Sequence, residues 1–308
     1  MTADVTGSRG IDVYVGDGNI DWKKVGASGI KFAMIKATQG YLVNDPKSGM
    51  ITDSKFRSNI TGAYENGLYC GAYHYLMAKT TADAKKEAEY FINTIMPYKD
   101  KIDLFAGVDM ENDKAKKYST KEKKLNTDIL IAFCDALESR GFDSIIYINP
   151  NFIKNYLEFD RLKGRNIWLA YWTEYDSVKK YIESFEDPSQ FRLWQYGDSS
   201  VDGISKKTDG DIALFDLSSH DVPVGSTKIP DGGDLNCYLT PGDYYSRTGN
   251  CKNAPDNCKA FILTVKNGAS GNRCFTLQIL YDIDSGTELK RGLYTKNGSF
   301  SGVQKNWR

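Results

Sequence analysis

The chain has 308 residues, with 40 basic and 40 acidic side chains and a formal net charge of zero. This balance excludes the strongly basic surface typical of nucleic-acid-binding proteins, and 41% hydrophobic residues suit one large domain plus a small one. No apolar stretch approaches the roughly 18 residues that cross a bilayer, so we expect no membrane span. The polar segment Met1 to Arg9 lacks the apolar core of a secretory signal, which predicts a protein made in the cytoplasm without a signal peptide.

From residue 10 to about 217, short apolar runs alternate with longer helix-like stretches, as in a parallel sheet or barrel. We expect helices at Ser54 to Asn66, Thr81 to Ile95 and Thr120 to Ser139, each opening near a Ser or Thr that can cap it. Later spacers are shorter and look less helical. The predicted fold is an irregular TIM-like α/β barrel with helices mainly between the first five strands. The eight expected strands are Ile11 to Val15, Phe32 to Ala37, Tyr69 to Leu76, Leu104 to Asp109, Ser144 to Ile148, Ile167 to Tyr171, Arg192 to Tyr196 and Ile212 to Phe215.

The tripeptide Asp109-Met110-Glu111 lies at the end of one of these strands and is the main candidate for catalysis. Side chains alternate along a strand, so both carboxylates point to one face while Met110 points to the other. Each carboxylate raises the pKa of its neighbour, which can separate the pair into a proton donor and an anion. Glycoside hydrolysis uses such a pair, although a short D-x-E pattern also occurs on ordinary exposed loops.

The composition changes at residues 218–232, where Ser, Gly, Pro and Asp replace the periodic pattern and predict a linker after a barrel domain at 1–217. Three β-like runs follow, Lys259 to Val265, Cys274 to Tyr281 and Glu288 to Tyr294. They predict a small all-β domain over residues 233–308.

Four of the six cysteines, Cys237, Cys251, Cys258 and Cys274, lie in this small domain. Their spacing lacks the paired pattern typical of zinc sites, and their redox state and pairing stay open. The chain contains only two histidines, His74 and His220, so a histidine-based metal centre or triad is hard to assemble. We expect neither metal nor cofactor, and a hydrogen-bonding role for His74.

Several segments in chain order resemble glycoside hydrolase family 25, the muramidases called Chalaropsis-type lysozymes. The resemblance covers residues 10 to about 217, and it departs from the family at Gln39, where many members carry Glu. The matching segments are Gly10-Ile11-Asp12-Val13, Ile20-Asp21-Trp22, Ile35-Lys36-Ala37-Thr38, Gly71-Ala72-Tyr73-His74-Tyr75, Val108-Asp109-Met110-Glu111, Tyr147, Trp168-Leu169-Ala170-Tyr171-Trp172 and Leu193-Trp194-Gln195-Tyr196.

The resemblance implies cleavage of the β-1,4 bond from N-acetylmuramic acid to N-acetylglucosamine in bacterial peptidoglycan. Glu111 would act as general acid and base, and Asp109 would stabilise the intermediate. We favour substrate assistance, in which the N-acetyl carbonyl of the sugar attacks the anomeric carbon, although inverting and retaining routes remain open.

The resemblance also implies further site residues. Asp12 and an acid of the eighth strand would add negative potential and hydrogen bonds to substrate; we prefer Asp211 to Asp209, because Ile212 and the apolar residues after it supply the strand. Four aromatic residues could contact sugar, with core packing as the rival role for each. They are Tyr73, Tyr147, Tyr171 and Trp194.

Two other functions remain open: a non-catalytic peptidoglycan-binding protein and a chitinase-like hydrolase. The presence of Asp12, Asp109 and Glu111 argues against a non-catalytic protein. The longer D-x-x-D-x-D-x-E pattern of chitinase-like enzymes is missing, because Phe105 and Gly107 stand where that pattern has its two earlier acids. The small domain is expected to bind the cell wall, with a secondary wall polymer as a further partner; a stabilising or an oligomerising domain is the alternative. A muramidase with a wall anchor and no signal peptide suggests a phage endolysin released through a holin, or else a bacterial autolysin.

Overall fold

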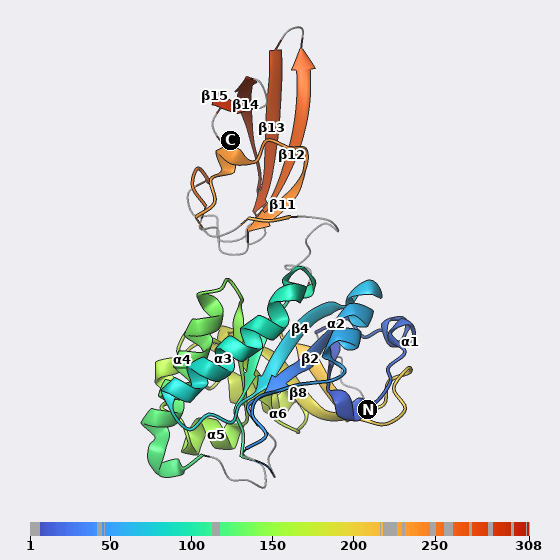
Figure 1. Cartoon of the computed structure of the whole chain (residues 1–308), viewed down its shortest axis with the longest axis vertical. Coiled ribbons are helices and arrows are strands. Elements are labelled where there is room, and N and C mark those ends of the chain that lie inside the picture. The colour runs from blue at the N-terminus through green and yellow to red at the C-terminus, as the bar shows by residue number, and fades with distance from the viewer. Residues whose placement is uncertain are drawn as a thin grey trace. The chain divides into compact units, whose positions relative to one another are not determined.

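The chain divides into two compact units, Met1–Leu217 and Ser218–Arg308 (Figure 1). The computed structural model describes residues 7–41, 45, 47–112, 118–215, 217, 227–229, 232–246, 251–255, 261–270, 273–282, 286–296, 299–305 and 307. Most of the predicted linker, together with His220 and Cys258, lies outside the described residues.

The first unit is a closed barrel of eight strands, in the order β1-β9-β8-β7-β6-β5-β4-β2 with β1 pairing back to β2. Neighbouring strands are parallel except at β9, which runs antiparallel to both β8 and β1. A ninth strand, β3, extends the sheet antiparallel to the end of β2. The strands are β1 (Arg9–Val13), β2 (Phe32–Gln39), β3 (Ile51–Thr52), β4 (Tyr69–Tyr75), β5 (Ala106–Asp109), β6 (Ser144–Ile148), β7 (Asn166–Ala170), β8 (Phe191–Ser199) and β9 (Thr208–Ala213).

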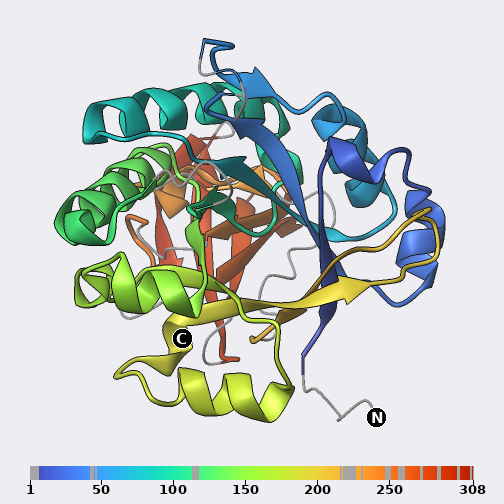
Figure 2. The same ribbon diagram turned by 90° about the horizontal axis from the view of Figure 1, so that it is seen from below.

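Helices lie outside the strands, so the barrel has an inner and an outer apolar layer (Figure 2). Inward side chains such as Phe32, Phe105 and Leu193 fill the barrel interior, and outward ones pack under the helices. The α-helices are α1 (Trp22–Ala27), α2 (Phe56–Glu65), α3 (Thr81–Ile95), α4 (Lys123–Glu138), α5 (Pro150–Asn155) and α6 (Tyr175–Ile182). Short 3-10 helices are η1 (Val15–Asp17), η2 (Met96–Lys101), η3 (Thr120–Glu122), η4 (Phe159–Leu162) and η5 (Pro188–Gln190).

The predicted barrel with helices mainly between its first five strands is confirmed, and the third predicted helix divides into η3 and α4. Thr80 caps α3 as expected, since its side chain accepts a hydrogen bond from the backbone of Asp83, whereas α2 begins after Lys55 without a side-chain cap. The last strand was misplaced in the prediction. It begins at Thr208, four residues before the predicted start, because its first half carries Asp and Gly rather than an apolar run.

The second unit contains a six-stranded sheet in the order β10-β11-β12-β13-β14-β15, antiparallel apart from the parallel pair β10 and β11. The predicted runs lie on strands of this sheet over their described residues, and residues 259 and 260 of the first run lie outside the described part of the chain. The elements are β10 (Thr227–Lys228), η7 (Leu235–Cys237), β11 (Gly242–Ser246), β12 (Phe261–Ser270), β13 (Arg273–Asp282), β14 (Glu288–Lys296) and β15 (Ser299–Lys305).

A buried polar cluster lies beside the apolar core of this unit. Gln278 is fully buried; its amide donates to the carbonyl oxygens of Leu235 and Tyr238 and accepts from Arg291 Nε at 2.7 Å. Cys237 is exposed and Cys251 half-buried, while the side chain of Cys274 lies outside the described residues. Within the described ranges of the chain, no helix has the length and hydropathy needed to span a membrane.

Candidate functional site

A cavity of about 170 Å³ opens where the parallel strands of the barrel end. Catalytic groups of such barrels lie at this rim. Four carboxyl groups and one lysine share the cavity with aromatic residues. Its lining consists of Asp12, Tyr14, Lys36, Tyr73, Tyr75, Asp109, Glu111, Tyr147, Trp168, Gln195 and Asp209.

The acidic pair at the end of β5 is oriented by the alternation of side chains along the strand. Asp109 and Glu111 both line the cavity, whereas Met110 is fully buried in the outer apolar layer. The backbone is held on both sides, since Leu76 N donates to Asp109 O at 2.9 Å and Met110 N donates to Tyr147 O at 3.2 Å. Asp109 is 7% exposed and Glu111 is half-buried, so solvent reaches the two carboxyl groups unequally.

Three further acids come from the strands that close the barrel. Asp12 on β1 pairs with Asp209 on the antiparallel strand β9, and both line the cavity. Because β9 runs in the opposite direction, its earlier residue lies nearer the rim, and Asp211 lies deeper, fully buried and outside the cavity lining. The residue in contact with the cavity is therefore Asp209, and Asp211 lies beneath it.

Gln195 connects the two sides of the site. Its Oε1 accepts hydrogen bonds from Tyr147 Oη at 3.0 Å and Trp172 Nε1 at 3.2 Å, and its Nε2 donates to Asp12 Oδ2 at 2.9 Å. These three bonds fix which end of the amide faces which partner. Gln195 therefore bridges Asp12 and Tyr147 by hydrogen bonds. Tyr147 on β6 is paired in the sheet with Asp109 on β5.

Burial shifts the protonation of this acidic group. Desolvation raises the pKa of Asp12 to about 8, with the charge of Asp209 adding to the shift and the hydrogen bond from Gln195 opposing it. Desolvation, together with Asp198 and Asp17, raises the pKa of Asp209 to about 6. Burial is also the main cause that raises the pKa of Tyr147 well above its ordinary value, and the charges of Asp109 and Glu111 contribute.

Lys36 places a positive charge in the same cavity. Its Nζ donates to Gln39 Oε1 at 2.8 Å and lies 4.8 Å from the centre of the Tyr75 ring. Burial lowers the pKa of Lys36, while the charges of Asp109, Asp53 and Glu111 act in the opposite direction. Gln39, noted as a departure from the family pattern, is thus a neutral partner of this ammonium.

Strand alternation divides the four aromatic residues predicted to contact sugar into two that line the cavity and two that face the outer layer. Tyr73 and Tyr147 line the cavity, whereas Trp194 is 3% exposed in the outer layer, where its Nε1 donates to Tyr171 O at 2.8 Å. Tyr171 also packs against this layer, and the centre of its ring lies 5.5 Å from the centre of the Tyr181 ring. In the described structure neither Trp194 nor Tyr171 lines the cavity.

Sequence reasoning missed several residues of the site. Gln195 follows Trp194 and so faces inward, and Lys36 precedes the outward Ala37; alternation along each strand would have identified both. Trp172 is 60% exposed, and Tyr14, at the rim of the cavity, is 44% exposed. Such exposed aromatic side chains follow the ends of strands, where no periodic signal marks them.

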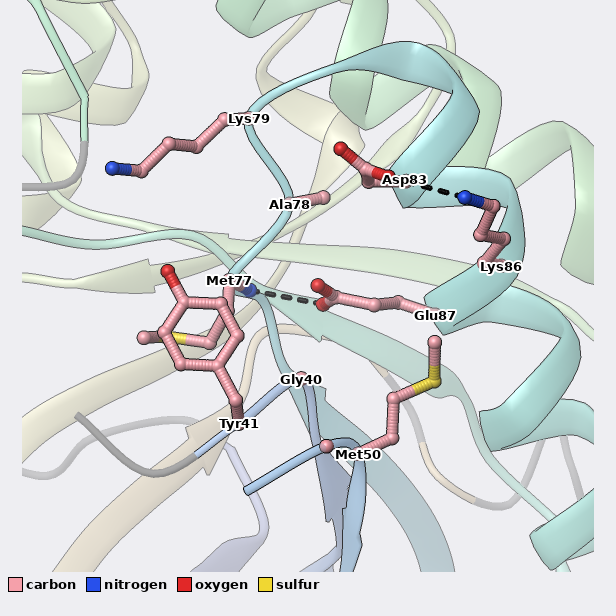
Figure 3. A pocket seen from close by; sticks show the side chains of 10 residues that line it. Gly40, Tyr41, Met50, Met77, Ala78, Lys79, Asp83, Lys86 and Glu87 are labelled. Atoms are coloured by element: carbon pink, nitrogen blue, oxygen red, sulfur yellow. Dashed lines mark hydrogen bonds and ion pairs between the residues drawn. The ribbon is translucent and has the colours of Figure 1, made fainter. Parts of the chain in front are cut away.

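A second cavity of about 350 Å³ lies between the ends of β2 and β4 and the first turns of α3 (Figure 3). Glu87 points toward Met77, whose backbone N–H donates to Glu87 Oε2 at 2.9 Å. The same oxygen lies 2.8 Å from His74 Nε2, and His74 Nδ1 lies 2.6 Å from Thr38 Oγ1. His74 is fully buried in this outer hydrogen-bond chain and away from the acidic cavity.

The described residues contain no group of three or more His, Cys, Asp or Glu side chains that could hold a metal ion. The acidic cavity therefore offers carboxyl, amide, ammonium and aromatic groups as its chemical equipment.

Comparison with known proteins gives a family match over residues 11–204, described as Glycosyl hydrolases family 25. An autolytic lysozyme of Clostridium acetobutylicum is 33% identical over 235 residues, which cover 74% of this chain and 62% of that protein. A D-alanyl-L-alanine endopeptidase of Streptococcus phage B30 is 28% identical over 160 residues, covering 50% of this chain and 34% of the relative.

Among solved structures, the spore cortex lytic enzyme SleM of Clostridium perfringens matches with a TM-score of 0.59 at 18% identity, covering 100% of this chain and 99% of that one. At this identity the likeness concerns the fold. The chain spans 62% of the length of the clostridial lysozyme, so that relative contains sequence with no counterpart here.

The raised pKa of Asp209 predicts how the stability of the barrel changes with pH. Asp209 titrates near pH 6 in the folded chain and near 3.8 when unfolded, so its contribution to stability falls as pH rises between these values and stays low above them. Asp209→Asn should raise the free energy of unfolding by about 1–2 kcal/mol at pH 8, allowing for solvent screening, and leave it unchanged at pH 3. Urea unfolding followed by tryptophan fluorescence measures both values; an equal change at the two pH values would contradict the shift.

Proposed function

Because this chain belongs to glycoside hydrolase family 25, we propose that it is a muramidase that hydrolyses the β-1,4 bond from N-acetylmuramic acid to N-acetylglucosamine in bacterial peptidoglycan. The family match runs from β1 through β8 and ends before β9, and the autolytic lysozyme of Clostridium acetobutylicum supports the same substrate. The observation that carries the proposal is the joint placement of Asp109 and Glu111 in one cavity at the rim of the barrel.

Glu111 is the proposed general acid and base. It is the more accessible of the pair, so it can reach the glycosidic oxygen of a bound chain and later a water molecule. Protonation of the leaving oxygen lets the bond to the anomeric carbon break. The same carboxylate then accepts the proton of the attacking water, which restores the acid.

Asp109 is proposed to stabilise the intermediate as an anion. In a substrate-assisted route, the N-acetyl carbonyl oxygen attacks the anomeric carbon and forms a cationic, oxazolinium-like ring, which a buried carboxylate can stabilise. The 7% exposure of Asp109 suits this role, since its field acts through little water. The ammonium of Lys36 in the same cavity favours the ionised form of Asp109.

The substrate contacts follow the lining of the cavity. We propose Asp12 and Asp209 as hydrogen-bonding groups at the substrate and Tyr73 and Tyr147 as aromatic contacts. The exposed ring of Trp172, tied to Gln195, takes the role of a sugar-stacking surface that the sequence had suggested for Tyr171 and Trp194.

Replacement of the acid tests the mechanism. Glu111→Gln should reduce turnover of purified peptidoglycan by about 10²- to 10⁴-fold, because the amide cannot donate the proton in catalysis, and binding to walls should persist. Release of new reducing ends measures turnover, and sedimentation with walls measures binding. Glu65→Gln, the same change at an exposed site on α2, is the control. Near-normal turnover by Glu111→Gln would refute the acid role.

The same assay separates the other two functions. Identification of N-acetylmuramic acid as the new reducing end supports the muramidase, whereas cleavage of chitin oligomers with no cleavage of peptidoglycan supports a chitinase-like enzyme. Wall binding by the wild-type chain without any new reducing end would indicate a non-catalytic binding protein.

The β-rich unit after the predicted linker at 218–232 is proposed to bind the cell wall, with a secondary wall polymer as a further ligand. A second attachment point holds the barrel near insoluble substrate and raises its effective concentration. In the Glu111→Gln background, a chain of residues 1–217 should bind purified walls at least tenfold more weakly than the full chain. Equal binding of the two in a sedimentation assay would assign attachment to the barrel alone.

We also propose that the chain acts as a phage endolysin released through a holin, with a bacterial autolysin as the alternative. The phage relative supports the first and the clostridial autolytic lysozyme the second. Cytoplasmic expression in a bacterium with a sensitive wall should cause lysis only when a holin is co-expressed, and Glu111→Gln should prevent it. Rapid lysis without the holin would contradict this route of release.

A further inference from the structure

Two carboxyl groups interact at the floor of the acidic cavity, where Asp12 lines the cavity and Asp211 lies beneath it. Asp211 is fully buried and Asp12 is 8% exposed. The antiparallel register pairs Gly10 with Asp211 and Asp12 with Asp209, so both carboxyls of β9 point to the same face as Asp12. Gly10, opposite Asp211, carries no side chain, and the apolar ring of Phe32 fills its place, so the carboxyl of Asp12 is the adjacent polar group.

One carboxyl oxygen of Asp211 accepts a hydrogen bond and the other, Oδ2, does not. Trp168 Nε1 donates to Asp211 Oδ1 at 2.8 Å, while no N–H or O–H group of the described residues donates to the buried Oδ2. An unsatisfied carboxylate oxygen at such depth is costly. The side chains of Asp12 and Asp211 interact, and two carboxyl groups can form a hydrogen bond only if one of them carries a proton.

The neighbouring acidic residues favour the protonated form of Asp211. Asp12 and Asp209 both act on it and both are acidic, so ionisation would place a further negative charge in a buried acidic cluster. Burial, followed by the charge of Asp12, raises the pKa of Asp211 well above its ordinary value. As a neutral acid, Asp211 can donate to Asp12, and Asp12 accepts from Gln195 on its Oδ2.

We propose that Asp211 is a positioning residue that stays protonated during turnover and donates a hydrogen bond to Asp12, holding that carboxyl in place at the substrate. The role rests on the proposed muramidase function. Asp211 supplies geometry and no charge, in contrast to the negative potential expected for it from the sequence. Trp168 fixes one oxygen of Asp211 as the acceptor, which leaves the other as the donor.

Two substitutions of Asp211 by residues of similar size test whether it acts as a neutral hydrogen-bond donor or as a catalytic anion. Asparagine reproduces the neutral acid, because its oxygen can accept from Trp168 and its amide N–H can donate to Asp12. Leucine provides neither bond. Asp211→Leu should lower the rate of reducing-end release by about 10- to 100-fold, and Asp211→Asn should restore it to within about fivefold of wild type, with the same pH profile. An Asp211→Asn protein as inactive as Asp211→Leu would overturn the proposal.

A readout independent of activity is the infrared spectrum of protein with ¹³C-labelled aspartate at pH 7. The wild-type chain should show a protonated carboxyl band that loses intensity in Asp211→Asn, whereas an unchanged band would overturn the proposal. Asp143→Asn, on the loop before β6, is the matched control and should leave the band unchanged. If wild-type protein releases no reducing ends, the muramidase proposal fails, while the infrared band still decides where the proton lies.

Discussion

Closure of the barrel by an antiparallel last strand is the constraint on which the site depends. A parallel β9 would place its carboxyl end at the active rim, whereas the antiparallel strand presents its first residues there. The closure brings Asp209 and Asp211 to the same face as Asp12 and buries like charges together. Folding therefore includes a desolvation cost, which is offset by protonation and by hydrogen bonds from Trp168 and Gln195.

This arrangement separates structural acids from reactive ones. The carboxyls of β1 and β9 approach the cavity from the closing side of the barrel, and the pair after β5 lies on another wall with Lys36 among its neighbours. Neutralisation by protons on one side and by an ammonium on the other lets several acids share a small cavity. A group that holds its proton tightly by burial is poorly suited to give it to substrate, which favours the more exposed Glu111 as donor.

Alternation along strands made much of the architecture predictable. The apolar runs identified the strands, and the inward direction of Asp109 and Glu111 followed from the outward Met110. The position of β9 could not be read in the same way, because an apolar rule fails where inward residues are Asp and Gly. The preference for Asp211 over Asp209 depended on that misplaced strand, which was expected to begin directly after Asp211.

The site residues that the sequence did not predict show a second physical reason why sequence patterns could not identify the whole site. Family motifs drew attention to the aromatic residues of β8, yet alternation turns Trp194 outward and its neighbour Gln195 inward. The role of Gln195 also depends on partners far along the chain, Tyr147 and Asp12, which only the closed barrel brings together. Short-range patterns predict which face a residue occupies, whereas its hydrogen-bond partners depend on strand register.

The contrast between the two buried networks shows what the acidic cavity is suited for. Glu87 bonds to a backbone N–H and to His74, which in turn meets Thr38, so that each group in the outer network has a complementary partner. The inner network instead brings Asp12 and Asp209 together at the cavity, with Asp211 beneath them. The negative charge proposed for Asp109 in this cavity would stabilise cationic character that develops there during the reaction. The oxocarbenium-like transition state of glycoside hydrolysis carries such a charge, which links the burial of these acids to the proposed chemistry.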